Sequence, residues 1–318
     1  MRTPIKTDVI IPVYKPDEKL VRLFKGLKDQ TVRPDNIIIM YTRLSRTDHI
    51  SPHLIELGTE VAELRVYELT ADQFDHGGTR AEAVGHSDAD IFIMMTQDAI
   101  PYDSRLIENL TEMLSDDTIA AAYARQLPDK TSSPAECFTR AFNYPAQTVV
   151  KGREDLDRLG IKTFFCSNVC AAYKRDVYDK LGGFIEHTIF NEDMIYAHGL
   201  IMNGYKIGYA ADAGVIHTHE YTPMQQLHRN FDLAVSQAEH PEVFAGISSE
   251  SEGAKYVKGA FSYFRNLRKG YLIIPFILSC CFKYLGYLLG KRYKKLPAKL
   301  VSALSMNKGY WVNDPEVS

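Results

Sequence analysis

Runs of apolar residues alternate with amphipathic stretches along the first hundred residues. The runs are short, rich in Ile, Val, Leu and Met, and are followed by turn-forming or polar residues, as is typical of strands buried in a parallel sheet. The predicted strands are residues 8–14, 36–41, 64–69 and 90–99. Residues 17–29 place their apolar side chains on one helical face. This alternation predicts an α/β fold with a mixed, mostly parallel sheet flanked by helices.

The second half continues the pattern and then changes to helix alone. We predict a strand at 119–126, a helix near 134–149, a strand and a short helix within 167–184, a helix at 193–205 and two short strands within 206–220. From residue 223 the pattern is helical to the end. We therefore predict an α/β domain at 1–222 and a helical region at 223–318.

Composition narrows the class of protein. The 318 residues are 45% apolar and 24% charged, which excludes general disorder. The five cysteines show no CxxC spacing, so we expect reduced thiols. The N-terminal segment MRTPIKTDVIIPVYKP lacks the apolar stretch of a signal peptide, and we expect a cytosolic start.

Charge is unevenly distributed. Residues 254–313 contain twelve Lys and Arg but no Asp or Glu, and the rest of the chain carries a formal charge of −15. A basic C-terminal region on an acidic body is expected to bind an anionic surface. No nucleic-acid-reading module accompanies the cations, so nucleic acid is not an expected partner.

The most apolar stretch, residues 270–290, lies within this basic region. It is long enough to span a bilayer, but Pro275, Lys283 and basic flanks on both sides disfavour a span. We expect one or two helices that lie in the interface between membrane and water. The protein would then be peripheral on the cytoplasmic side of the cell membrane. A buried helix pair or a homo-oligomer interface is the alternative.

Acidic residues stand at the ends of two predicted elements, and one of these ends is the carboxyl end of a strand, where ligands of α/β sheets bind. Asp98 follows the apolar part of the fourth strand. It is placed to bind a divalent cation that in turn holds a diphosphate. The alternative is a structural role as the N-cap of the following helix. Glu192 and Asp193 open a helix, where the dipole favours acids and where one could act as a general base. His217 and His219 are two residues apart, so on a strand their side chains would point the same way. They are either metal ligands or a structural pair of hydrogen-bonded histidines.

A glycine-rich segment, QFDHGGTRAEA, combines Gly77 and Gly78 with Arg80 in the first turn of a predicted helix. There the arginine opposes the helix dipole and needs a local anion, either a phosphate or an acid such as Asp75. The segment is not GxGxxG, and the chain has no GxxxxGK[ST]. A dinucleotide dehydrogenase and a P-loop NTPase are therefore disfavoured.

The order of these motifs over residues 6–222 resembles the family-2 inverting glycosyltransferases of the GT-A fold. Within that family it is most similar to bacterial rhamnosyltransferases that build cell-surface polysaccharide. The segments that carry the resemblance are IIPVYKP, FDHGGTRAEA, MTQDAIPYD, YARQLP, FFCSNVCAAYKRDVYDKLGGF, NEDMIYAHGLIMNGYKIGYA and VIHTHEYT.

The resemblance assigns roles to individual residues. Asp193 matches the catalytic base, and Asp98, with His217 or His219, matches the site of a divalent cation, Mg²⁺ or Mn²⁺. The residues expected beside the nucleotide-diphosphate sugar are Pro12, Tyr14, Thr42, His76, Gly77, Arg80, Gln97 and Asp98. Those expected beside the acceptor are Arg125, Gln126 and Glu192.

Two departures from the family pattern bear on the donor. Thr96 stands where the first acid of the DxD motif is usual, which leaves the metal one carboxylate fewer. Tyr41 and Thr42 stand where an acid usually reads uracil, which favours dTDP-rhamnose over a uridine sugar. The resemblance thus implies inverting transfer of L-rhamnose to a lipid-linked or polysaccharide acceptor. The alternatives are a sugar nucleotidyltransferase and a non-catalytic membrane-bound partner on a degenerate transferase fold.

Overall fold

The apolar runs form the strands of one sheet in the computed structural model of the chain, which describes residues 5–245 and 250–312. Among the described residues the sheet has nine strands in the order β3-β2-β1-β4-β8-β6-β9-β5, with β7 beside β9. The strands are β1 (Thr7–Tyr14), β2 (Asn36–Arg43), β3 (Glu63–Thr70), β4 (Ile91–Met95), β5 (Ile100–Pro101), β6 (Ile119–Leu127), β7 (Val149–Lys151), β8 (Cys170–Lys174) and β9 (Lys206–Ile216). The predicted mixed α/β sheet with flanking helices is confirmed.

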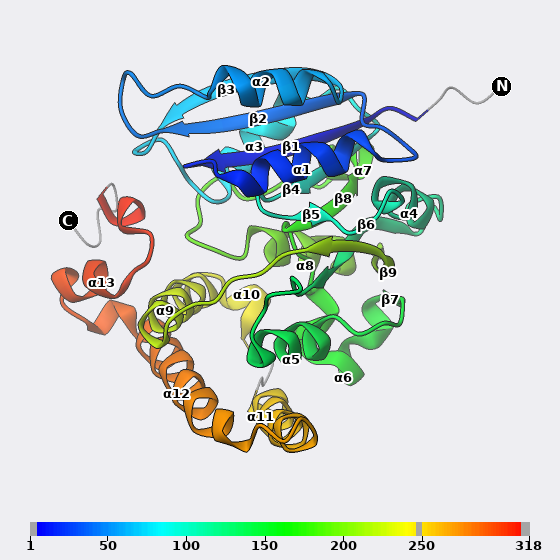
Figure 1. The fold of residues 1–318 in the computed structure, drawn as a ribbon. Coiled ribbons are helices and arrows are strands. Elements are labelled where there is room, and N and C mark those ends of the chain that lie inside the picture. Colours follow the sequence, from blue (N-terminus) through cyan, green and yellow to red (C-terminus); the bar gives the residue numbers. More distant parts are fainter. Residues whose placement is uncertain (1–4, 246–249, 313–318) are drawn as a thin grey trace.

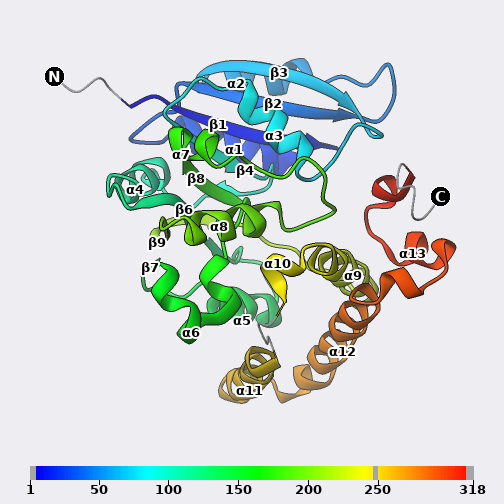
Figure 2. The ribbon, with the colours of Figure 1, turned by 180° about the vertical axis from the view of Figure 1, so that it is seen from behind.

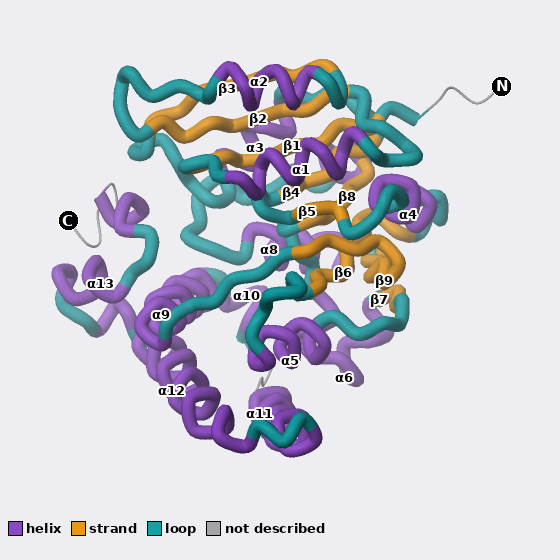
Figure 3. Tube along the Cα trace, viewed as in Figure 1, coloured by secondary structure: helices purple, strands orange, loops and turns teal. Residues whose placement is uncertain are grey.

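Strand direction brings distant parts of the chain to one edge of the sheet. β1, β2, β3 and β4 run parallel. β8 is antiparallel to both β4 and β6, so β6 runs in the direction of β4, and β9 is parallel to β6. The carboxyl ends of β1, β2, β4, β6 and β9 therefore share an edge. Figure 3 shows these strands side by side in orange. Ligands of open α/β sheets bind beyond that edge.

Helices cover both faces of the sheet (Figures 1 and 2). Successive residues of β1 point to opposite faces: Val9 and Ile11 pack toward α1, whereas Ile10 packs toward α3. The helices on the two faces are α1 (Glu18–Lys28), α2 (Pro52–Thr59) and α4 (Leu106–Met113) on one, and α3 (Gly78–Gly85), α7 (Arg175–Lys180) and α8 (Glu192–Met202) on the other.

Two expectations from the pattern are wrong in detail. The helix expected at 134–149 is α5 (Pro134–Asn143), which ends just before Tyr144–Pro145 because a residue preceding proline disfavours helical backbone. The segment 206–220 contains one strand, β9 (Lys206–Ile216), rather than two, and His217 and His219 follow it. The interruption is an irregularity in its pairing with β6, where Ala124 pairs with Ala210 but Arg125 pairs with Gly214.

Beyond residue 222 the described chain forms helices and short turns. These are α9 (Pro223–Glu239), α10 (Pro241–Phe244), α11 (Glu250–Asn266), α12 (Ile273–Gly290), α13 (Ala298–Leu304) and the 3-10 turns Gly270–Leu272, Tyr293–Lys295 and Lys308–Val312. Two apolar clusters join them to the preceding part: Phe231, Tyr293 and Trp311 pack with Ile189, and Phe264 and Phe276 pack with Phe138. The domain boundary at residue 222 stays a prediction.

Candidate active site

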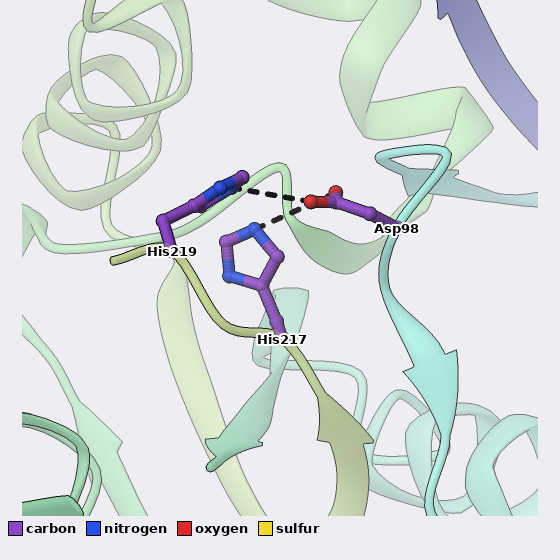
Figure 4. Close-up of side chains that lie close together, drawn as sticks. All are labelled: Asp98, His217 and His219. Atoms are coloured by element: carbon purple, nitrogen blue, oxygen red, sulfur yellow. Dashed lines mark ion pairs between the residues drawn. The ribbon is translucent and has the colours of Figure 1, made fainter. Parts of the chain in front are cut away.

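The loop after β4 and the end of β9 bring three potential metal ligands together (Figure 4). His217 follows the last residue of β9, and its Nε2 lies 3.5 Å from Asp98 Oδ1. His219 Nε2 lies 3.2 Å from Asp98 Oδ2. The ligand atoms of the three residues all lie within 4.8 Å of one another. One carboxylate and two imidazoles therefore face a common point at the carboxyl edge of the sheet.

Both imidazoles are suited to bind a cation. Burial lowers the pKa of His217 well below its ordinary value and also lowers the pKa of His219, with nearby cations adding to the effect. Both rings are therefore neutral at physiological pH and offer a nitrogen lone pair. Three protein ligands leave coordination positions open for oxygens of a diphosphate. The donor set thus fits a divalent cation.

Gln126, which the resemblance places beside the acceptor, contacts His217 in the structure. The amide oxygen of Gln126 lies 2.9 Å from His217 Nδ1 and also accepts a hydrogen bond from Arg140. Because a guanidinium only donates, the amide oxygen must face both groups, and the proton of His217 must lie on Nδ1. The Nε2 lone pair is thereby turned toward Asp98. A salt bridge of 2.7 Å to Glu136 holds Arg140 in turn.

The acidic pair at the start of α8 is placed by Asn168. Its backbone N–H donates to Asp193 Oδ2 at 3.0 Å, and its side-chain amide donates to Glu192 Oε1 at 3.1 Å. The backbone N–H of Met194 donates to Asp193 Oδ1 at 2.8 Å. Asn191, just before the pair, has the left-handed φ of 65°, and this conformation redirects the chain into the helix.

The two acids differ in their ionisation. Burial and the neighbouring Glu192 carboxylate raise the pKa of Asp193 to about 7. Burial also opposes ionisation of Glu192, but the Arg80 guanidinium, whose Nε lies 3.2 Å from Glu192 Oε1, and the hydrogen bond from the Asn168 amide are among the groups that together outweigh it, so the pKa of Glu192 is lowered. Asp193 is therefore the acid whose proton affinity suits a general base near neutral pH.

The glycine-rich segment forms the tight start of α3. Asp75 Oδ1 accepts hydrogen bonds from the backbone N–H groups of Gly77 and Gly78, at 2.8 and 3.0 Å. A Cβ on Gly77 would lie 1.9 Å from the carbonyl oxygen of Ile185, so only glycine fits there. We name residues 75–80 the donor loop. The anion that Arg80 needs is supplied by Glu192, not by Asp75.

His76 is enclosed within the donor loop. Its carbonyl accepts a hydrogen bond from Arg80 Nη1 at 2.7 Å. Burial and the same guanidinium lower the pKa of the His76 imidazole to about 4, which keeps the ring neutral. The ring packs against Phe190 with centroids 5.5 Å apart.

The remaining predicted site residues occupy different surroundings. Tyr14 and Thr42 are register partners at the ends of β1 and β2, and Pro12 lies two residues earlier on β1. Gln97 ties β1 to the loop after β4: its amide accepts from Tyr14 N and donates to Tyr14 O, both at 2.9 Å. Arg125 Nε donates to the carbonyl of Tyr144 at 3.3 Å, and the structure does not join it to the metal-ligand cluster.

Three residues near the cluster were not predicted from the sequence. Lys19 Nζ lies 3.7 Å from Asp98 Oδ2. Asn168, described above, positions both acids. Arg229 of α9 lies over the ring of Phe190, 4.6 Å from its centroid, and 5.9 Å from the centroid of Tyr221, which stacks on His219. Asn168 lies in a segment that carries the family resemblance but was given no role, whereas Lys19 and Arg229 lie outside those segments. The contacts of all three residues become apparent only in the fold.

Comparison with solved structures is consistent with this architecture. A mannosyltransferase from Pyrobaculum calidifontis in complex with GDP-Man and Mn²⁺ superposes with a TM-score of 0.56 at 14% identity, over 98% of this chain and 86% of that one. S. aureus TarS in complex with UDP-GlcNAc superposes with a TM-score of 0.52 at 13% identity, over 92% of each chain. At these identities the likeness shows a shared GT-A-like fold.

Sequence comparison is more specific. Residues 8–182 match the Glycosyl transferase family 2 domain. The chain is 39% identical over 314 residues to the O-antigen chain rhamnosyltransferase RfbN of Salmonella typhimurium, covering 97% of each protein. It is 37% identical over 311 residues to the O-antigen chain rhamnosyltransferase WbaN of Salmonella anatum, covering 96% of this chain and 95% of that protein. The chain therefore belongs to glycosyl transferase family 2, and its sequence is homologous to O-antigen rhamnosyltransferases along nearly its whole length.

Proposed function

We propose that this glycosyltransferase moves L-rhamnose from dTDP-β-L-rhamnose to a hydroxyl of a lipid-linked or polysaccharide acceptor, with inversion at the anomeric carbon. The choice of sugar rests on the full-length similarity to the two O-antigen rhamnosyltransferases. The chemistry rests on Asp193, whose raised pKa and position at the carboxyl edge of the sheet suit a general base.

The transfer is a single displacement. The acceptor oxygen attacks the anomeric carbon, its proton passes to a carboxylate oxygen of Asp193, and the bond from that carbon to the diphosphate oxygen breaks. Glu192 stays ionised because Arg80 pairs with it, and its negative charge raises the proton affinity of Asp193. General base catalysis of this kind contributes about 10²–10⁴ in rate.

Asp98, His217 and His219 would hold the divalent cation, which supplies charge neutralisation for the leaving diphosphate. Mg²⁺ prefers oxygen ligands, and two of these three ligands are imidazole nitrogens, so we expect Mn²⁺ to bind more tightly than Mg²⁺. Arg229 is close enough to His219 and Tyr221 to add a positive charge beside the same diphosphate.

The test is donor turnover with purified full-length protein. We expect dTDP-rhamnose to be hydrolysed or transferred faster than UDP-glucose or UDP-GlcNAc, with Mn²⁺ present, and the activity to be lost in EDTA and restored by Mn²⁺. Faster turnover of a uridine sugar would refute the donor assignment. Absence of turnover with every donor and a synthetic acceptor would favour a non-catalytic partner instead.

The metal site has its own test. Asp98→Ala should weaken dTDP binding strongly when Mn²⁺ is present and leave it unchanged in EDTA, as measured by calorimetry. Ile5→Ala, at an exposed position before β1, is the matched control. Equal dTDP binding by the Asp98 variant and the wild type in Mn²⁺ would contradict a metal held by this residue.

A further inference from the structure

Helix α12 has an inner face that is fixed to the rest of the protein at both ends. Near its C-terminal end, a Cβ on Gly286 would lie 2.2 Å from the Leu227 carbonyl of α9, so the two helices pack backbone to backbone. Near its N-terminal end, Phe276 is buried in a cluster with Phe138 of α5 and Phe264 of α11. Figures 1 and 2 both show α9 between α12 and the sheet.

The opposite face of α12, with the turn before it, is apolar and exposed. Five of its exposed residues recur at helical spacing and form one stripe: Tyr271, Ile274, Leu278, Cys281 and Leu285. Ile274 is 78% exposed and Tyr271 is 71% exposed. We name these five residues the outer stripe. Within the described residues nothing covers it, and so large an apolar surface indicates an interaction site.

Lys283, the single charged residue between 270 and 290, does not interrupt the outer stripe. Its ammonium lies 5.6 Å from the ring centroid of Tyr256 of α11, on the inner side of the helix. Lys283 therefore does not place a charge on the exposed apolar face of α12.

Cations flank the outer stripe at both ends. The exposed residues are Arg265, Arg268 and Lys269 before it, and Arg292, Lys294, Lys295 and Lys299 after it. Residues 254–313 contain no Asp or Glu. We propose that the outer stripe docks on an anionic lipid surface, with α12 lying parallel to it and both groups of cations at the level of the headgroups.

The geometry favours lying on the membrane over crossing it. Residues Gly270–Gly290 are long and apolar enough to cross, with a mean hydropathy of 1.9. A crossing helix, however, would have to leave α9, α11 and α5, which cover its inner face. Cations at both ends also suit a helix in the interface, because a spanning helix usually has its positive residues mainly on one side.

The same charges disfavour a second copy of the chain as the occupant. Two outer stripes that packed together would bring the flanking cations of both copies close, without any acid in residues 254–313 to pair with them. Like charges across an interface oppose association. An anionic bilayer complements both the stripe and its flanks.

The experiment is vesicle co-sedimentation of the full-length protein, without donor or acceptor. The protein should sediment with phosphatidylcholine vesicles that contain phosphatidylglycerol, stay soluble with phosphatidylcholine alone, and be released by salt. Because no sugar transfer is measured, the result is independent of the proposed reaction. Failure to bind phosphatidylglycerol vesicles at low salt would overturn the proposal.

A pair of variants tests the outer stripe itself. Ile274→Glu with Leu278→Glu should lower the partition coefficient at least tenfold, whereas Ile5→Glu, on an equally exposed apolar residue elsewhere, should leave it unchanged. Both positions of the double variant are exposed, so circular dichroism and thermal unfolding should match wild type. Equal binding by the double variant and the wild type would contradict docking through this face.

A second set tests the flanking charges. Lys269→Gln, Lys295→Gln and Lys299→Gln together should weaken binding by roughly a hundredfold at low salt, since each lysine near an anionic surface contributes severalfold. The matched control replaces Lys25 and Lys130 of the α/β part by Gln. Light scattering gives the oligomeric state: a wild-type dimer that the Glu variants convert to monomer would show that the stripe binds a second copy and would overturn lipid docking.

Discussion

Asp193 and Glu192 show how two adjacent acids acquire different chemistry from their surroundings. Both are held by Asn168, but only Glu192 is paired with Arg80. The unpaired carboxylate beside a charged one binds its proton more tightly, which gives Asp193 a pKa of about 7. A helix N-terminus alone would favour the ionised form of both.

We predict that Asp193→Asn lowers the rate of rhamnose transfer by about 10²–10⁴ and leaves dTDP binding nearly intact. In the wild type the rate should rise with pH through about 7, because the base must be deprotonated to accept the acceptor proton. Initial rates over pH 5–9 and calorimetry with dTDP measure both. Near-normal turnover by the variant would refute the role of Asp193.

The raised pKa of Asp193 also predicts that the folded wild-type protein becomes less stable as the pH rises, whereas its activity increases. The carboxyl of Asp193 titrates near 3.8 when unperturbed and at about 7 in the folded protein, so its ionisation destabilises the fold progressively from pH 4 to pH 7. Asn cannot ionise. The melting temperature of Asp193→Asn relative to wild type should therefore increase between pH 4 and pH 8. A difference that does not change with pH would contradict the raised pKa.

Gln126 acts through His217 in this structure. We predict that Gln126→Leu weakens Mn²⁺ binding about 10–100-fold, because the imidazole loses the acceptor that holds its proton on Nδ1. Mn²⁺ binding followed by electron paramagnetic resonance, without donor, measures this. Arg125→Gln is the control, since Arg125 contacts the Tyr144 carbonyl and not the cluster. Equal losses in the two variants would argue for a general change in the fold.

Among the elements, the donor loop and α3 depend most on close backbone packing. Asp75 caps the first N–H groups of the helix, and Gly77 lets residues 185–188 approach. This contact connects the donor loop to the segment that leads into α8, and therefore to Glu192. Arg80 and Glu192 are brought together by the packing of these two segments.

We predict that Gly77→Ala lowers the melting temperature and raises KM for the donor. The new methyl group would meet the Ile185 carbonyl at 1.9 Å, which forces the two segments apart. Gly85→Ala, in the same helix with nothing within 4 Å of the added Cβ, should instead be neutral or stabilise by up to about 1 kcal/mol. Thermal unfolding and donor titrations of both variants separate local crowding from helix propensity.

In the whole molecule, the C-terminal segment returns to the donor loop. Tyr310 stacks on His187, with ring centroids 4.6 Å apart and planes 7° from parallel. His187 Nδ1 in turn lies 2.8 Å from Asp75 Oδ2, the residue that caps α3. Tyr310, far beyond the α/β part, is therefore linked through His187 to the loop expected to bind the donor.

We predict that Tyr310→Ala and His187→Ala each raise KM for the donor roughly fivefold, since such a ring pair contributes about 1 kcal/mol. The double variant should show little further increase, because either change alone breaks the link. Ile5→Ala, at an exposed position outside the donor loop and the outer stripe, is the control. Additive effects in the double variant would show that the two rings act independently.

The pattern of apolar residues was sufficient to predict a mixed, mostly parallel sheet with flanking helices, because alternation of buried strands with amphipathic helices leaves few possible arrangements. It did not predict the short strands β5 and β7. The motif order and strand ends also placed Asp98, His217 and His219 in one candidate site. These predictions depend on local spacing and on the rule that parallel strands present their carboxyl ends at one edge.

Tertiary structure decided which groups meet and how they ionise. The partner of Arg80 is Glu192 rather than Asp75, Gln126 contacts His217, and Arg229 of α9 lies over the ring of Phe190. Each contact joins segments far apart in the chain, so no local pattern contains it. The raised pKa of Asp193 likewise arises from burial and from a neighbour whose own charge depends on Arg80. Proton affinity depends on the whole environment of a side chain, and only the packed structure defines that environment.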